Sequence, residues 1–204
     1  MKVFCFWEGG FASNTYLITD EGGKNGVIAD PSASYETVCR EYGTLPRISG
    51  IILTHGHFDH ILQADVWREK TGAPLLIGKN DAPMLSSSAL NASSELLGVS
   101  VRVQPADGFL TEGDTVSVGD EHLLVWETPG HSPGSLCFLG DTFLLSGDTM
   151  FAGNYGRYDL PGGDYAVLTA SLKRLSSLPD DTRIFPGHGR DTYIQFEKPR
   201  YIDR

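Results

Sequence analysis

The stretch Thr54-His55-Gly56-His57-Phe58-Asp59-His60 places three imidazoles and a carboxylate within six residues, from His55 to His60. It follows the apolar run 48–53, which predicts a strand, and precedes 61–70, whose apolar residues recur at helical spacing before Thr71-Gly72. The chain has only 6 histidines, so half of them lie in this stretch. This pattern predicts one half of a metal site between a strand and a helix.

The spacing inside the stretch determines which ions its side chains can reach. His55 and His57 are two residues apart at a strand end, where alternate side chains point the same way, so both imidazoles can reach one ion. Asp59 and His60 turn into the helix and can face a second ion beside the first. One local segment therefore supplies ligands for two metals.

The remaining ligands must come from elsewhere, because zinc takes about four ligands and a catalytic zinc keeps one position for water. Three candidates end or follow predicted strands and are framed by glycine, which allows sharp turns and close backbone approach: His131 in Pro129-Gly130-His131-Ser132-Pro133-Gly134, Asp148 in Ser146-Gly147-Asp148-Thr149, and His188 in Phe185-Pro186-Gly187-His188-Gly189. A single such residue is commonly a turn former. Five of the 6 histidines in strand-end turns argue for a metal site.

The rest of the chain predicts two sheets with helices outside them. Strands are expected over 3–7, 14–19, 26–29, 74–77, 99–103, 115–118, 122–127, 136–139, 142–146 and 183–185, and helices over 34–42 and 165–175, with one or two more across 80–97. No linker divides these elements. We predict one α+β domain over residues 1–204, an αββα sandwich of two mixed β-sheets with helices on the outer faces.

Charge and hydropathy exclude several classes of partner. The formal net charge of -10 argues against nucleic acid, whose phosphates select basic surfaces. No apolar run approaches the roughly 20 residues that a membrane helix needs, so no membrane partner is expected. The first seven residues are too short for a signal peptide, and the sequence predicts a cytoplasmic protein.

The three cysteines are widely separated and form no C-x-x-C pair. This spacing supports neither a disulfide framework nor a thiolate zinc site. We expect Cys5, Cys39 and Cys137 to be small buried hydrophobic residues.

The four histidine and aspartate motifs occur in order between residues 54 and 189, and together they resemble the metallo-β-lactamase superfamily. Within it, Gly147-Asp148-Thr149-Met150-Phe151 and Arg157-Tyr158-Asp159-Leu160-Pro161-Gly162-Gly163 are similar to the short hydroxyacylglutathione hydrolase (glyoxalase II) type. The resemblance implies the αββα fold and a dinuclear site. It implies that one metal is held by His55, His57 and His131, the other by Asp59, His60 and His188, and that Asp148 bridges them.

The same resemblance implies a metal-dependent hydrolase that activates water against a small-molecule thioester, S-lactoylglutathione or a related hydroxyacyl thioester. Zinc is the expected metal, with iron or manganese as alternatives. Asp59 and Asp148 are the expected catalytic carboxylates, Asp59 by orienting the attacking water. Thr54, Ser132 and Ser135 can hold the imidazoles in place from outside the metal shell, or serve only as turn and cap residues.

Substrate contacts are expected from Arg157, Tyr158 and Arg190, which lie just beyond the ligand turns. Only sixteen residues follow His188, whereas the longer glyoxalase II enzymes carry a C-terminal helical domain that supplies basic contacts to glutathione. The main alternative is a mononuclear iron oxidoreductase of the persulfide dioxygenase kind. A β-lactamase is less favoured, because the best-known ones use cysteine at the position of Asp148, and a metal-stabilised scaffold is favoured least.

Overall fold

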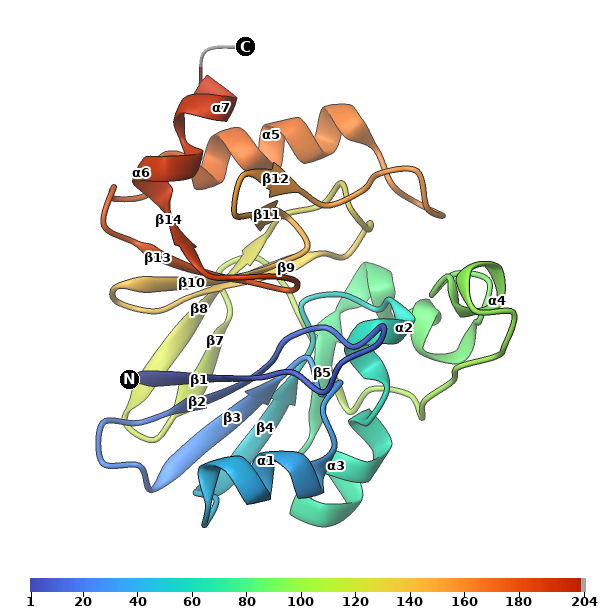
Figure 1. Ribbon diagram of the computed structural model, residues 1–204, viewed down its shortest axis with the longest axis vertical. Helices are drawn as coiled ribbons and strands as arrows, with labels where there is room; N and C mark the ends of the chain where they lie inside the picture. Colours follow the sequence, from blue (N-terminus) through green and yellow to red (C-terminus); the bar gives the residue numbers. More distant parts are fainter. Residues whose placement is uncertain (203–204) are drawn as a thin grey trace.

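Two six-stranded sheets face each other in the computed structural model, which describes residues 1–202 (Figure 1). The strands are β1 Lys2–Phe6, β2 Thr15–Thr19, β3 Asn25–Ala29, β4 Arg47–Ile52, β5 Leu75–Gly78, β6 Gly108–Leu110, β7 Thr115–Val118, β8 Glu121–Glu127, β9 Leu136–Leu139, β10 Phe143–Gly147, β11 Met150–Phe151, β12 Asn154–Tyr155, β13 Arg183–Pro186 and β14 Thr192–Tyr193. The helices are α1 Tyr35–Tyr42, α2 Phe58–Ile61, α3 Ala64–Thr71, the 3₁₀ helix η1 Lys79–Ser86, α4 Ser93–Leu96, α5 Tyr165–Leu175, α6 Ile194–Glu197 and α7 Pro199–Ile202.

Both sheets are mixed, and their parallel pairs bring distant segments to one edge. The first sheet has the order β1-β2-β3-β4-β5-β6, and β3 runs parallel to β4 with Ala29 opposite Ile52. The second has the order β14-β13-β10-β9-β8-β7, and β10 runs parallel to β13 with Leu145 opposite Phe185. Because parallel neighbours end at the same edge, the residues that follow β3 and β4 lie together, as do those that follow β10 and β13.

Three apolar layers hold the sheets and helices together, and alternation along the strands builds them. Ile51 of β4 packs with Trp67 of α3 in the layer beneath α1 and α3. The next residue, Ile52, belongs to the layer between the two sheets. Leu168 and Leu172 of α5 pack on the outer face of the second sheet. Figure 1 shows α1 and α3 on one side of the molecule and α5 on the other, which confirms the predicted αββα sandwich.

One predicted strand is wrong. The β-branched run 99–103 forms no strand, and the strand in this part of the chain is β6. The amides of this run are used elsewhere: Val101 N donates to Ser93 Oγ and Val103 N donates to the carbonyl of Leu85. These bonds tie the run to α4 and η1 rather than to a neighbouring strand.

The helix predicted over 61–70 is divided into α2 and α3. Gln63 lies at the break, where its backbone amide donates a hydrogen bond to the carbonyl oxygen of Pro31. Gly72 ends α3 in a left-handed conformation, as the sequence predicts. All three cysteines are free, but only Cys137 is buried; Cys5 is exposed, so the expectation of burial is wrong there.

Within residues 1–202, no helix combines the length and apolar character that crossing a membrane requires.

Gly130 allows the loop that carries His131 to lie against α5. Its φ is +131°, and a Cβ there would lie 2.2 Å from the backbone nitrogen of Leu168. We expect Gly130→Ala to lower the free energy of unfolding by about 3 kcal/mol or more, through backbone strain and overpacking together. Gly98→Ala is the matched control, since Gly98 also has a positive φ of +69° but nothing within 4 Å. Equal losses for the two variants in urea denaturation would contradict the close approach.

Candidate metal centre

The structure brings the seven predicted ligand residues to the edge where the strands of both sheets end. His55 and His57 follow β4, and Asp59 and His60 lie on α2. The other three lie in loops of the second half of the chain: His131 between β8 and β9, Asp148 after β10, and His188 after β13. The parallel pairing of the strands thus brings distant motifs together.

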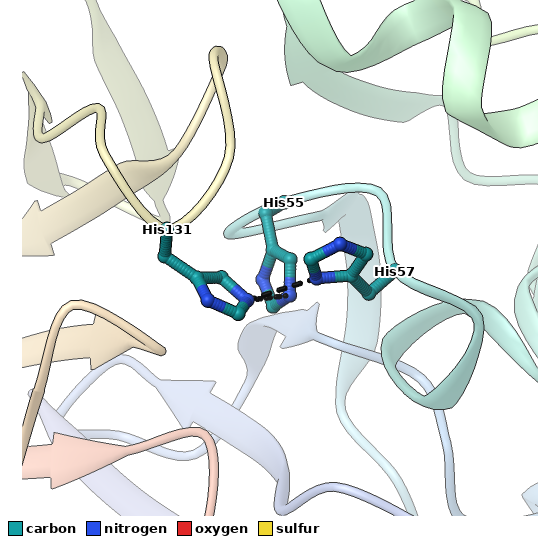
Figure 2. A group of neighbouring side chains, drawn as sticks. All are labelled: His55, His57 and His131. Carbon is teal, nitrogen blue, oxygen red and sulfur yellow. Dashed lines mark hydrogen bonds between the residues drawn. The ribbon is translucent and has the colours of Figure 1, made fainter. Parts of the chain in front are cut away.

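His55, His57 and His131 form one compact group of nitrogen atoms (Figure 2). Nε2 of His131 lies 2.8 Å from Nδ1 of His57 and 3.1 Å from Nε2 of His55. Two nitrogens bound to one tetrahedral zinc at 2.0–2.1 Å would be about 3.3 Å apart. The group therefore has nearly the spacing that a shared ion requires.

Asp59, His60 and His188 form a second group. Nε2 of His188 lies 3.0 Å from Oδ2 of Asp59, and Nε2 of His60 lies 3.9 Å from the same oxygen. Asp148 lies between the two groups: its Oδ1 is 3.3 Å from Nε2 of His60, and its Oδ2 is 3.6 Å from Nε2 of both His131 and His188. One carboxylate thus faces both sets of imidazoles.

Buried polar atoms at this centre fit a divalent cation. Within the described residues, Nε2 of His60 and Oδ1 of Asp148 are buried without a hydrogen-bond partner, although they are close enough to attract each other. Buried polar atoms are usually paired, because leaving one unpaired costs about 1–3 kcal/mol. Gly187 makes room for them, since a Cβ there would lie 2.1 Å from Oδ1 of Asp148. A mixed imidazole and carboxylate set of this kind suits zinc, iron or manganese.

The pKa values show which groups can act as neutral or anionic ligands. Burial lowers the pKa of His57 to about 3, and burial together with the neighbouring imidazoles lowers the pKa of His55. For Asp148 and Asp59, burial is outweighed by the nearby imidazoles, His60 first, and both pKa values are lowered. Both carboxylates are therefore anionic at neutral pH, and His55 and His57 are neutral, as metal ligands must be.

His60 and His188 carry the protons that metal binding must displace. Burial opposes a charge on each ring, but Asp30, Asp148 and Asp59 outweigh it at His60, and Asp59 and Asp148 outweigh it at His188, so both pKa values are raised. The raised pKa values favour the protonated rings, whereas a bound imidazole must be neutral. We expect metal loading near neutral pH to release protons from these rings, up to about two per chain.

Calorimetric titration in buffers of different ionisation enthalpy measures this release. His122→Ala is the control, because His122 lies exposed on β8 and should leave the number unchanged. Heats that do not depend on the buffer would contradict the raised pKa values.

Asp30 is a supporting residue that the sequence alone does not predict. It is buried directly after β3 with a positive φ of 49°. Its carboxylate accepts from Thr54 N at 2.8 Å and Thr54 Oγ1 at 2.7 Å, and lies 2.9 Å from Nδ1 of His60. Thr54 Oγ1 also lies 3.1 Å from Nδ1 of His55, which is one of the two roles that the sequence left open for Thr54. The sequence feature that could have indicated Asp30 is its position, an acidic residue between the apolar run 27–29 and Pro31.

The carbonyl group of Arg157 and the carboxylate of Asp81 hold the loop of His131 in place. Nδ1 of His131 lies 2.6 Å from the carbonyl oxygen of Arg157, which fixes its ring. Within residues 1–202, the hydroxyl groups of Ser132 and Ser135 form no hydrogen bond with an imidazole. Ser132 Oγ donates to Asp81 at 2.6 Å and bonds Ser135 Oγ, and the Asp81 carboxylate also accepts from the amides of Gly134 and Gly56. Asp81 thus joins the His131 loop to the segment between His55 and His57.

A cavity of about 560 Å³ opens onto the centre and includes His57, Asp59, His131, Asp148 and His188 in its lining. Of the predicted substrate residues, only Arg157 lines it. Tyr158 packs instead against Tyr165, with ring centroids 4.8 Å apart, and Arg190 is exposed. A larger cavity of about 700 Å³ lies at the other end of β4, around Arg47 and Lys70, and contains none of the seven residues.

The chain is similar in sequence and in fold to several known proteins. Residues 9–188 match the model of the metallo-β-lactamase superfamily. The chain is 37% identical over 194 residues to the probable metallo-hydrolase YqgX of Bacillus subtilis, covering 92% of this chain and 89% of the relative. It is 31% identical over 194 residues to the hydroxyacylglutathione hydrolase GloC of Haemophilus influenzae, covering 92% and 91%.

Two solved structures have nearly the same length and fold. The B3 metallo-β-lactamase BLEG-1 superimposes with a TM-score of 0.89 at 33% identity, and TTHA1623 in a di-iron-bound form with 0.82 at 36% identity. Each comparison covers 98% of both chains. By sequence and by fold, the chain belongs to the metallo-β-lactamase superfamily.

Proposed function

We propose that this protein hydrolyses thioesters with two divalent metal ions, in a single domain over residues 1–204. In this proposal His55, His57 and His131 would hold one ion, Asp59, His60 and His188 would hold the other, and Asp148 would serve as a ligand for both. The observation that carries the proposal is the position of the Asp148 carboxylate, 3.3–3.6 Å from imidazoles of both groups on the floor of one cavity. The relationship to GloC supports a thioester as substrate.

Metal ions at this centre would lower the pKa of water toward neutrality and polarise a carbonyl oxygen. The chain's own groups orient the reactants. Asp59 is anionic and lines the cavity, so its carboxylate can accept a hydrogen bond from the attacking water. Asp30, Thr54 and the carbonyl of Arg157 fix the imidazole rings by contacting their second nitrogen. No side-chain nucleophile is required.

A substrate panel with metal-loaded protein tests the proposal. We expect protein with two equivalents of zinc to hydrolyse lactoylglutathione or a simpler thioester, and to act poorly on nitrocefin. Protein that binds two equivalents of zinc, iron or manganese and leaves every thioester intact would overturn the proposal. Faster hydrolysis of nitrocefin than of any thioester would place it with BLEG-1 instead.

The alternative function is a mononuclear iron oxidoreductase acting on persulfides. The observation that favours it is the compact His55, His57 and His131 group, which could hold one iron beside the cavity that His57 and His131 line. One bound iron per chain, with oxygen uptake in the presence of glutathione persulfide, would decide for it. The cytoplasmic location predicted from the sequence stays a prediction.

A further inference from the structure

Apolar side chains form the wall of the cavity above the metal centre. Trp7 and Phe11 come from the loop between β1 and β2, Leu96 from α4, Phe151 from β11 and Leu160 from the loop after β12. Three of them are unusually exposed for their size: Trp7 at 63%, Phe11 at 67% and Leu96 at 43%. Exposed apolar groups that gather around a cavity mark a surface that binds a ligand.

Hydrogen bonds hold the loop of Trp7 and Phe11 in position. Glu8 accepts from Ser34 N at 2.8 Å and from Ser34 Oγ at 2.7 Å at the start of α1. Trp7 Nε1 donates to the carbonyl of Ala12 at 3.1 Å, and Ser13 N donates to the carbonyl of Asp59 at 3.3 Å. The two aromatic rings therefore line the cavity on a loop that is tied both to α1 and to the ligand residue Asp59.

Lysine and arginine are scarce on this wall. Among residues 1–202, Arg157 is the one lysine or arginine that lines the cavity. Its Nε and Nη2 atoms bond both carboxylate oxygens of Asp159, at 2.7 and 2.8 Å, and this contact lowers the pKa of Asp159 to about 2. An anionic carrier such as glutathione would meet a guanidinium already paired with a carboxylate, on a protein of net charge -10.

We propose that the preferred substrate is an uncharged thioester with a large apolar group, which packs on Trp7, Phe11 and Leu96 while its carbonyl lies over the metal centre. This inference deepens the proposed function and rests on it for the reacting bond. Phe11 is the specificity residue that we single out, because it is the most exposed of the five and lies on the anchored loop.

Kinetics with uncharged N-acetylcysteamine thioesters of acyl length two to eight carbons test the inference, with lactoylglutathione as the anionic comparison. We expect kcat/KM to rise two- to fourfold for each added methylene, since burying one contributes about 0.8 kcal/mol. Phe11→Ala should lower kcat/KM for the octanoyl thioester about tenfold and change that for the acetyl thioester less than twofold. Phe196→Ala is the matched control, because Phe196 is 61% exposed on α6 and does not line the cavity.

A binding measurement separates failure of this inference from failure of the proposed function. Calorimetry with metal-loaded protein measures the affinity for two uncleavable substrate analogues, in which a methylene group separates the carbonyl carbon from the sulfur. One analogue carries an octyl group and the other a methyl group. We expect the octyl compound to bind at least tenfold more tightly, and Phe11→Ala to remove that preference. Equal binding of the two, or a lactoylglutathione kcat/KM above that of the octanoyl thioester, overturns the inference. Tight octyl binding without hydrolysis of any thioester would support the apolar site and reject the proposed reaction.

Discussion

Asp148→Asn is expected to lower kcat/KM for thioester hydrolysis about a thousandfold and to leave at most one metal tightly bound. The amide keeps the size of the side chain but removes the charge that faces His60, His131 and His188. Losing one group that stabilises charge in a transition state costs about a hundred- to a thousandfold, and loss of a metal adds to this. Enzyme kinetics and metal analysis of the same sample measure both effects.

Asp141→Asn is the control for this substitution, because Asp141 is an exposed acid in the turn between β9 and β10. It should leave rate and metal content unchanged. If Asp148→Asn kept two metals and more than a tenth of the activity, Asp148 would not be the group shared by both ions.

Asp30→Ala is expected to be the most destabilising substitution at the centre. It would leave Thr54 N, Thr54 Oγ1 and Nδ1 of His60 without their acceptor at a site that is 1% exposed. Removing one partner of a buried ion pair costs about 3–5 kcal/mol, and removing the partner of a metal-binding histidine lowers metal affinity about 10–100-fold. Urea denaturation of metal-free protein and competition with a chelator measure the two losses.

Asp114→Ala is a suitable comparison, since the exposed Asp114 also accepts from a backbone amide, that of Thr111 at 2.8 Å. It should cost about 1 kcal/mol and leave metal affinity unchanged. Equal effects of the two substitutions would show that Asp30 acts only as a local turn acceptor.

The sequence predicts the sandwich well because its strands are short apolar runs separated by turn residues. Ile51 and Ile52 of β4 lie in different layers, and because both are isoleucine only the structure distinguishes the two faces. The run 99–103 shows where predicting strands from apolar runs fails. Its valines have the same character, but pairing depends on which backbone groups are nearby, and here Leu85 and Ser93 take its amides.

Local spacing also explains what could be predicted of the centre. His55 to His60 are close in sequence and glycine-framed motifs mark the other candidates, so all seven residues could be named. Asp30 could not, because its role depends on β3 lying parallel to β4, a pairing between segments some twenty residues apart. The apolar wall was missed for the same reason, since Trp7, Leu96 and Phe151 meet only in the folded chain.

The most direct test of a two-metal thioester hydrolase is a zinc titration of metal-free protein with thioester hydrolysis measured at each ratio. We expect the rate to rise until two equivalents are bound and then to stay constant. A rate that reaches its maximum at one equivalent, or no hydrolysis with two equivalents bound, would contradict it.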